Sequence, residues 1–197
     1  AGGGGRFDPG MLYYMPQTWT SDNTDSFERL KIQWGTSMLY PPISMGAHVS
    51  EIPNHQVKRS TPLHTRGNVA MSANLGYELD LLKLSDEDKK IVTWQIAFYK
   101  SVRKTVQFGQ FYRLLSPYKD KATAWMIVSP DQKEIIVYYF RHLAVPNDVE
   151  KKLHLKYLNP ETLYVLEDGR EFYGDSLMYF GLRLPQMNGD FDSVMVV

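Results

Sequence analysis

The first 25 residues concentrate side chains that could do chemistry on a small polar ligand. A glycine run at 2–5 is followed by Arg6, and Trp19 precedes two carboxylates, Asp22 and Asp25. Glycines let backbone N–H groups approach a ligand with no Cβ in the way. A tryptophan offers a flat apolar face, and an aspartate beside it can donate or accept a proton. This combination predicts a site that binds hydroxyl groups through polar atoms and packs a sugar ring against an aromatic side chain.

Longer motifs extend this pattern along the chain. They are Gly-Gly-Gly-Gly-Arg-Phe-Asp-Pro-Gly at 2–10, Trp-Thr-Ser-Asp-Asn-Thr-Asp at 19–25, Glu-Arg-Leu-Lys-Ile-Gln at 28–33, Gly-Ala-His-Val-Ser at 46–50, Pro-Asn-His-Gln at 53–56 and Gly-Tyr-Glu-Leu-Asp at 76–80. In these motifs, and along nearly its whole length, the chain resembles the glycoside hydrolases of family 36, the bacterial α-galactosidases or melibiases. The resemblance identifies it as a carboxyl-terminal fragment of such an enzyme.

The resemblance implies a role for several of these residues. The aspartate of the Trp-Thr-Ser-Asp motif is the general acid/base of the family, which gives that role to Asp22. Gly3 matches a glycine whose backbone contacts galactose, and Trp19 matches an aromatic side chain that lines the same pocket. Arg6 and Asp25 complete the expected substrate-binding set. Arg6 could equally be an ion-pair partner, and Asp25 could instead hold the start of a helix or orient Asp22.

The second carboxylate of the mechanism is not found in this chain. Taken alone, an aspartate in front of a helix is more often a cap than an acid. As acid/base, Asp22 would protonate the glycosidic oxygen and later deprotonate the water that resolves the glycosyl-enzyme. The family places its nucleophile in a Lys-Trp-Asp motif on an earlier barrel strand, and the sequence has no Lys-Trp-Asp. We therefore expect the chain to contain the acid/base without the nucleophile and to be inactive by itself.

Composition bears on the possible partners. The 197 residues include 22 acidic and 22 basic side chains, so the formal charge of zero indicates neither nucleic acid nor an anionic membrane as a partner. No apolar run approaches the roughly 18 residues that a membrane-spanning helix needs. Because the chain begins at Ala1 inside a glycine run, we interpret it as a piece of a longer polypeptide. We expect that protein to be cytoplasmic, although this segment does not allow an export signal to be judged.

Neither a cofactor nor a metal ion is expected. The chain has no cysteine, which excludes disulfides and thiolate metal sites within it. His48 and His55 lack the His-Glu-x-x-His spacing of a zinc site, and we expect hydrogen-bonded histidines at the pocket rim instead. The glycine run is not followed by a phosphate-binding spacing. The two-carboxylate mechanism implied by the resemblance needs no cofactor.

The order of expected elements predicts an α/β domain followed by an all-β domain. Residues 1–109 should form the carboxyl-terminal part of a (β/α)8 TIM barrel, with strands at 11–15, 43–49 and 68–82, a helix after Asp25 and a long helix that Ser85 caps. Asp22 would then lie at the carboxyl end of a strand, where barrel enzymes place catalytic groups. Residues 110–197 should form an antiparallel β-sandwich, with a hairpin at Asp168-Gly169 and a last strand at 192–197.

The resemblance implies a retaining α-galactosidase that hydrolyses terminal α-galactosides such as melibiose and raffinose. It also implies that the full-length parent is a homotetramer. Among enzymes, an α-N-acetylgalactosaminidase or a galactosyltransferase of the raffinose-synthase type would share much of this framework. Outside enzymes, the chain could be a non-catalytic sugar-binding module, and the sequence leaves these alternatives open.

Overall fold

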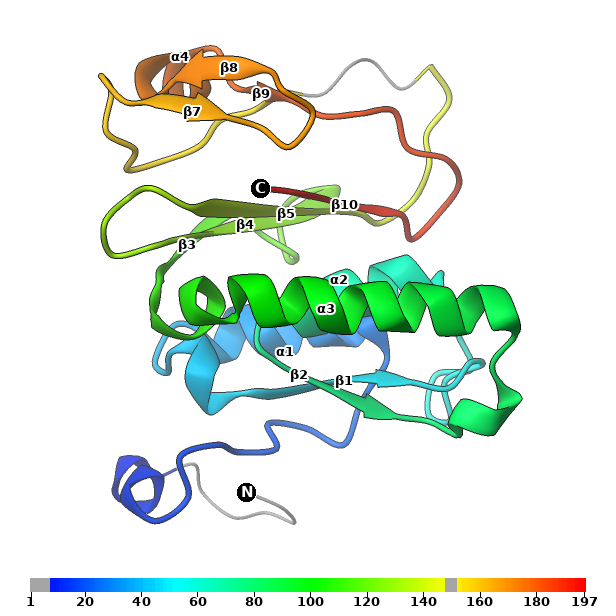
Figure 1. Ribbon diagram of the computed structural model, residues 1–197. Coiled ribbons are helices and arrows are strands. Elements are labelled where there is room, and N and C mark those ends of the chain that lie inside the picture. Colours follow the sequence, from blue (N-terminus) through cyan, green and yellow to red (C-terminus); the bar gives the residue numbers. More distant parts are fainter. Residues whose placement is uncertain (1–7, 148–151) are drawn as a thin grey trace. The chain divides into compact units, whose positions relative to one another are not determined.

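The computed structural model describes residues 8–147 and 152–197, which belong to two compact units, Ala1–Phe108 and Gly109–Val197. Unit 1 mixes helices and parallel strands, and unit 2 is built mainly of antiparallel strands (Figure 1). In chain order, the elements of unit 1 are η1 (Pro9–Tyr13), α1 (Ser26–Thr36), η2 (Pro42–Ser44), β1 (Gly46–Ser50), α2 (Leu63–Met71), β2 (Asn74–Glu78), η3 (Leu81–Lys83) and α3 (Asp86–Phe108).

The sheet of unit 1 is small and parallel. Strands β1 and β2 pair from Gly46↔Asn74 to Ser50↔Glu78, and Thr18 forms a parallel bridge with Met45 on the other side of β1. Among the described residues these segments form an open sheet, so no barrel closes within this chain. Figure 1 shows α1, α2 and α3 on one side of β1 and β2.

The side of the sheet that faces the helices is apolar. Ala47 and Val49 of β1 are buried in one cluster with Leu63 and Ala70 of α2 and Val92 of α3. Because successive strand residues point to opposite faces, the residue between Ala47 and Val49, His48, points away from the helices. The helices therefore cover one face of the sheet, and the opposite face is left for His48 and its neighbours.

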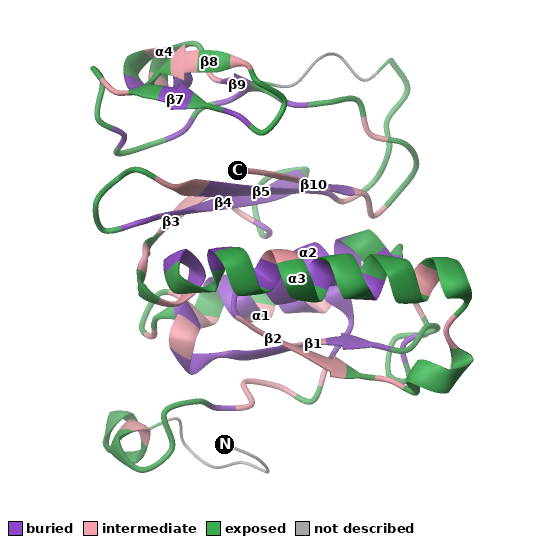
Figure 2. Cartoon of the chain, viewed as in Figure 1, coloured by how far each residue is buried: buried purple, intermediate pink, exposed green. Residues whose placement is uncertain are grey.

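The strand predicted at 68–82 is confirmed only over Asn74–Glu78, because a helix occupies its first part. The chain is helical in α2 and extended only in β2. Nearly every residue of α2 is buried, as Figure 2 shows, so the sequence has no polar stripe that would mark a helix. Gly67 permits this burial, since a Cβ there would lie 2.0 Å from Nε2 of Gln95.

The strand predicted at 11–15 was wrong. Residues Pro9–Tyr13 form the short 3-10 helix η1, and the Asp8 carboxylate accepts a hydrogen bond from the backbone N–H of Gly10 (2.7 Å) at its start. Proline in the first position fixes a backbone angle that suits a helix. The apolar residues after Pro9 therefore sit on an exposed turn and not in the sheet.

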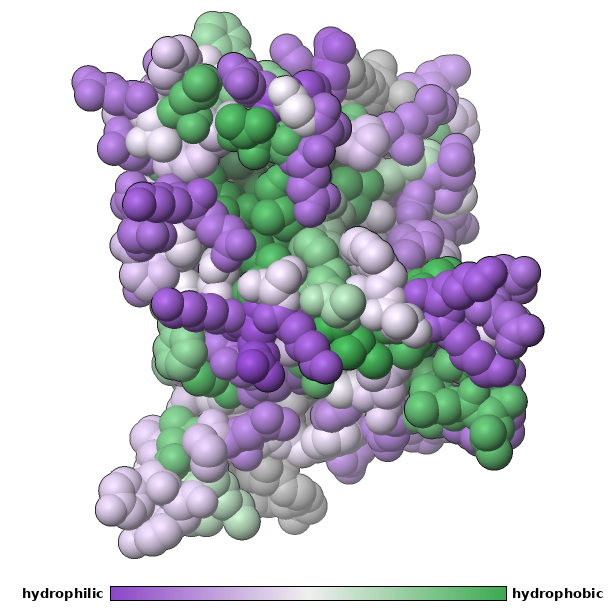
Figure 3. Space-filling model, in the orientation of Figure 1, coloured by the Kyte–Doolittle hydropathy of each residue, from purple (hydrophilic) through white to green (hydrophobic). Residues whose placement is uncertain are grey.

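The long helix α3 was predicted from its start. It runs over Asp86–Phe108, and the Ser85 hydroxyl accepts a hydrogen bond from the N–H of Asp88 (3.1 Å). Just before it, Leu81 and Leu82 of η3 are exposed at the carboxyl end of β2. Figure 3 shows hydrophobic side chains at this segment, next to the charged start of α3. Among the described residues, no helix is both long and apolar enough to cross a membrane.

Unit 2 contains a four-stranded antiparallel sheet in the order β10-β5-β4-β3. Two further antiparallel pairs, β6 with β9 and β7 with β8, and one short helix complete the unit. The elements are β3 (Gln110–Leu115), β4 (Ala122–Val128), β5 (Ile135–Arg141), β6 (Lys152–Leu153), β7 (Leu163–Val165), β8 (Glu171–Tyr173), α4 (Gly174–Tyr179), β9 (Leu182–Arg183) and β10 (Ser193–Val196). The hairpin at Asp168-Gly169 is confirmed, and Gly169 has the positive φ of 84° that such a turn favours.

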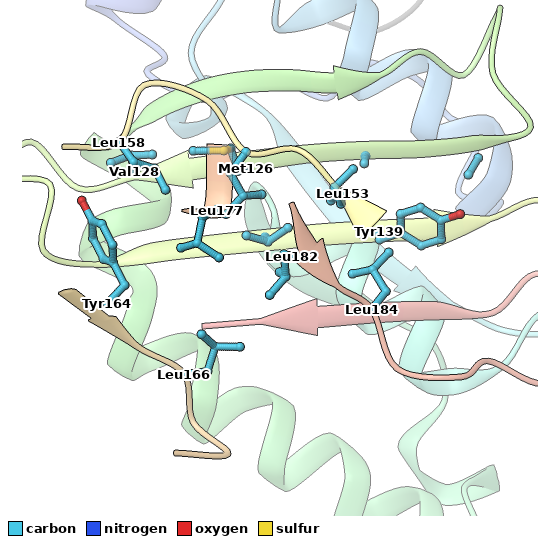
Figure 4. Close-up of a cluster of buried hydrophobic side chains, with 14 residues drawn as sticks. Met126, Val128, Tyr139, Leu153, Leu158, Tyr164, Leu166, Leu177, Leu182 and Leu184 are labelled. Atoms are coloured by element: carbon cyan, nitrogen blue, oxygen red, sulfur yellow. The ribbon is translucent and has the colours of Figure 1, made fainter. Parts of the chain in front are cut away.

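The core of unit 2 is apolar. Met126, Val128 and Tyr139 from the four-stranded sheet pack against Leu177 and Leu182 from the other elements (Figure 4). These side chains come from segments far apart in the sequence, so the cluster holds the unit together. Burial of each such side chain contributes about 1.5–3 kcal/mol.

Candidate active site

Asp22 lies at the end of the extended segment that begins at Thr18, four residues before α1. Its side chain is exposed, and among the described residues its carboxylate has no hydrogen bond or ion pair. The backbone oxygen of Asp22 accepts a hydrogen bond from Nε2 of Gln56 (3.4 Å). Gly3 and Arg6, the other two expected ligands near this end of the chain, lie outside the described residues.

The turn around Asp22 is fixed by a series of short-range hydrogen bonds. The Ser21 hydroxyl accepts from the N–H of Asn23 (3.1 Å), and the Asn23 side-chain oxygen accepts from the N–H of Asp25 (3.0 Å). The Asp25 carboxylate in turn accepts from the N–H groups of Phe27 (3.1 Å) and Glu28 (3.0 Å). Side chains that bind nearby backbone groups in this way favour turns and helix starts. The backbone on both sides of Asp22 is therefore fixed while its carboxylate is left exposed.

Asp25 caps helix α1, as its position before the helix predicted. Glu28 does not return a hydrogen bond to the N–H of Asp25, because that N–H donates to the side-chain oxygen of Asn23. The Asp25 carboxylate is almost fully buried and forms an ion pair with Arg59, whose Nη2 lies 3.9 Å from Oε1 of Glu28. The observed contacts of Asp25 hold the helix start, and its substrate-binding role stays a prediction.

The end of β1 and the segment between β1 and α2 donate hydrogen bonds to the same turn. Asn54 is buried, and its Nδ2 donates to the hydroxyl of Thr24 (3.3 Å), while the Ser50 hydroxyl donates to the backbone oxygen of Thr24 (3.3 Å). The Asn54 side-chain oxygen accepts from the N–H groups of Gln56 and Val57, both at 3.0 Å. The sequence contains the Pro-Asn-His-Gln motif at 53–56 but predicts no role for Asn54. An asparagine after a proline is a signal for such a turn, although the sequence does not indicate its partner.

A buried arginine forms hydrogen bonds with the extended segment before Asp22 and with β1. Nη1 of Arg29 donates to the Thr20 hydroxyl (3.0 Å), and Nη2 donates to the backbone oxygen of Gly46 (2.7 Å). Burial lowers the pKa of Arg29 to about 10, so the side chain remains charged at neutral pH. Because Arg29 belongs to α1, it connects the helix that follows Asp22 to the extended segment that precedes it.

Trp19 is half-buried and stacks on His48. The ring centroids are 3.7 Å apart and the planes differ by 22°. Burial, with the nearby charge of Arg29, lowers the pKa of His48 to about 4, so His48 is neutral at pH 7. The rim histidine was expected to form hydrogen bonds, but among the described residues His48 forms this ring stacking and no hydrogen bond, and His55 is exposed. Trp19 and His48 therefore form one stacked aromatic pair.

Trp19 and His48 lie on the face of the unit 1 sheet opposite the helices, and Asp22 follows Trp19 along the chain. The exposed carboxylate of Asp22 follows the half-buried Trp19 by three residues. The turn that holds this carboxylate is fixed by its own short-range hydrogen bonds and by those from Ser50 and Asn54. Such an arrangement can pack the apolar face of a sugar and transfer a proton at its edge. Within the described residues, no three histidine or acidic side chains lie close enough to bind a metal ion.

Two family descriptions match the chain. Residues 1–109 match the melibiase family, and residues 122–197 match the glycosyl hydrolase family 36 C-terminal domain. The chain is 58% identical to the α-galactosidase AgaA of Geobacillus stearothermophilus and 47% identical to the α-galactosidase Mel36A of Lactobacillus acidophilus. It is covered to 99% in both comparisons and spans 27% of the length of each relative.

Solved structures give the same result. The crystal structure of AgaA from Geobacillus stearothermophilus matches with a TM-score of 0.96 at 58% identity, over 99% of this chain and 27% of that one. The galactosidase domain of the α-galactosidase–sucrose kinase AgaSK matches with a TM-score of 0.95 at 44% identity, over 98% and 27%. Another AgaA structure contains raffinose. The chain therefore belongs to the melibiases of glycoside hydrolase family 36.

Proposed function

We propose that this chain is the acid/base-bearing part of a retaining α-galactosidase that hydrolyses terminal α-galactosides such as melibiose, raffinose and stachyose. The observation that supports this most is the contrast between two carboxylates three residues apart. Asp25 is buried and bonded to the helix start and to Arg59, whereas Asp22 is exposed at the end of a fixed turn. Solved structures of the Geobacillus enzyme contain raffinose or stachyose, which supports the same substrate class.

In the proposed reaction, Asp22 donates its proton to the glycosidic oxygen while the bond from C1 of galactose to that oxygen breaks. A nucleophilic carboxylate from a part of the protein outside this chain forms an ester with C1. Asp22 then removes a proton from water, whose oxygen attacks C1 and releases galactose and the nucleophile. Trp19 would pack against the sugar ring, and Gly3 and Arg6 would bind its hydroxyl groups. Asp25 would keep Asp22 in place through the turn that both share.

The finer architecture belongs to the same proposal. Residues 1–109 would supply the last strands and helices of a (β/α)8 barrel, and residues 110–197 would form a β-sandwich. The parallel direction of β1, β2 and the Thr18 segment supports the first part, because barrel strands are parallel. The packing of the four-stranded sheet against the other elements of unit 2 supports the second. A homotetrameric parent is part of the proposal, and light scattering of the full-length protein measures it.

The leaving-group dependence of an Asp22→Asn variant tests the role of Asp22. The full-length protein that contains this chain is assayed with raffinose and with 4-nitrophenyl α-galactoside. Loss of the acid should lower kcat/KM for raffinose by about 10²–10⁴-fold, because that leaving group needs a proton. The nitrophenolate leaves without one, so bond cleavage in that substrate should suffer far less.

The matched control is Asp86→Asn, which replaces an exposed aspartate at the start of α3. It should change kcat/KM for either substrate by no more than about twofold. Equal losses for both substrates in a normally folded Asp22→Asn protein would contradict the acid role. Faster hydrolysis of 4-nitrophenyl α-N-acetylgalactosaminide than of the galactoside by the unmodified protein would favour the N-acetylgalactosaminidase alternative. Galactose binding without turnover would favour the binding-module alternative.

A further inference from the structure

Three neighbouring segments of the sheet place a tryptophan, a histidine and a glycine in one row. Trp19 follows Thr18, which forms a parallel bridge with Met45, the residue before β1, and His48 of β1 is paired with Gly76 of β2. The Trp19 ring stacks on the His48 ring at 3.7 Å. The row therefore runs across three parallel segments, on the face of the sheet opposite the helices.

Gly76 provides the space that the histidine ring occupies. A Cβ at position 76 would lie 2.3 Å from Cδ2 and 2.7 Å from Nε2 of His48, which is too close for any side chain to fit without moving the ring. The imidazole is thus held between the backbone of Gly76 and the ring of Trp19. The position of the Trp19 ring depends on a residue 57 positions further along the chain, through one intermediate ring.

The contacts of His48 are those of a flat ring and not those of a base. Among the described residues, its imidazole forms no hydrogen bond, and its ring is stacked nearly parallel to the indole. It is neutral at pH 7, because burial and the charge of Arg29 disfavour its protonated form. A neutral ring with no proton-transfer partner can support a neighbouring ring without taking part in chemistry.

We propose that His48 and Gly76 are positioning residues that set the plane of Trp19 as the wall of the sugar pocket. This inference rests on the proposed function, in which Trp19 packs against the galactose ring. It assigns His48 a role in substrate affinity that depends on its shape and not on its proton. Gly76 acts indirectly, because its missing side chain lets the His48 ring lie flat.

Two substitutions of His48 separate shape from proton chemistry. In the full-length protein, His48→Ala removes the ring that supports Trp19 and should raise KM for 4-nitrophenyl α-galactoside roughly three- to tenfold, the range expected for loss of an aromatic pair. His48→Phe keeps a flat ring and should leave KM within about twofold of the unmodified protein. In both variants kcat should change much less than KM. The matched control, His154→Ala, removes an exposed histidine of unit 2 and should change neither constant by more than about twofold.

Gly76→Ala tests the other end of the row. Its Cβ should displace the His48 ring and raise KM as His48→Ala does. The double variant Gly76→Ala, His48→Ala should have the same KM as His48→Ala alone. Non-additivity of this kind is expected only when the two residues act through the same contact. Additive increases in KM would contradict the proposal that the three residues act as one unit.

A readout independent of activity distinguishes failure of the row from failure of the proposed function. The fluorescence of Trp19 is obtained as the difference between each protein and its Trp19→Phe counterpart. This spectrum should shift in His48→Ala and Gly76→Ala and stay close to that of the unmodified protein in His48→Phe, even if the protein hydrolyses another sugar. If both variants are folded by circular dichroism and KM rises as much in His48→Phe as in His48→Ala, the proposal is overturned.

Discussion

The two units of this chain use their interiors in different ways. Among the described residues, buried polar and charged side chains gather in unit 1, whereas those of unit 2 are Thr123, Ser129, Arg141 and Ser193. The interior of unit 2 is mainly apolar, because leucines and the apolar side chains of the sheet form the cluster shown in Figure 4. In unit 1, buried residues such as Arg29 and Asn54 donate hydrogen bonds to the strand and turn that flank Asp22.

This difference shows how a fold separates stability from the geometry of a site. An apolar cluster stabilises a unit without directing any particular atom, because the hydrophobic effect has no preferred direction. Hydrogen bonds are directional, so buried polar side chains can fix a turn to within a narrow range of positions. Unit 1 therefore carries the polar interactions that a site requires, and substitutions in the two units should have different consequences.

A core substitution in unit 2 should have the largest effect on stability and little effect on the site. Leu182→Ala removes a side chain that is only 1% exposed, and the cavity should lower the free energy of unfolding by about 3–5 kcal/mol. The matched control, Leu163→Ala, removes an exposed leucine and should cost far less. Urea unfolding of the full-length protein measures both. A large loss of kcat in folded Leu182→Ala protein would contradict the division of roles between the units.

Substitution of Asp25 should affect both stability and the site. Asp25→Ala removes the cap of α1 and the partner of Arg59, and we expect a loss of about 2–4 kcal/mol. Asp25→Asn keeps a good cap and removes the charge, so it should lose about half as much. Because the turn of Asp22 is anchored here, kcat for raffinose should fall in the Ala variant more than in the Asn variant. Equal activity of all three folded proteins would show that the anchor does not position Asp22.

The sequence allowed part of this arrangement to be predicted. The cap by Asp25, the start of α3 and the Asp168-Gly169 hairpin depend on residues within a few positions of one another, and all three were predicted. Helix α2 was missed because burial on all sides removes the alternation of polar and apolar residues that marks a surface helix. The contacts of Asn54, Arg59 and His48 join positions about 30 residues apart, and nothing in the local pattern indicates them.

A smaller effect is expected from pH. The pKa of His48 is about 4 in the folded protein and about 6.5 in an unfolded chain, so between these values the unfolded state binds a proton that the folded state does not. The free energy of unfolding should therefore decrease as the pH falls from 6.5 towards 4. His48→Phe should remove this contribution, so the variant should lose less thermal stability than the unmodified protein between pH 7 and pH 5. Equal losses of thermal stability in both proteins would show that the pKa of His48 is not lowered by folding.

Chemical rescue of Asp22→Ala tests the central claim most directly. Without its base, the variant should accumulate the galactosyl-enzyme formed from 4-nitrophenyl α-galactoside, because no group activates the water that resolves it. Azide needs no base, and it should attack C1, break the ester to the nucleophile and yield α-galactosyl azide with a clear increase in rate. The unmodified protein should show neither the increase nor this product. An Asp22→Ala protein that folds normally, retains its activity on raffinose and does not respond to azide would contradict the assignment of Asp22 as the acid/base.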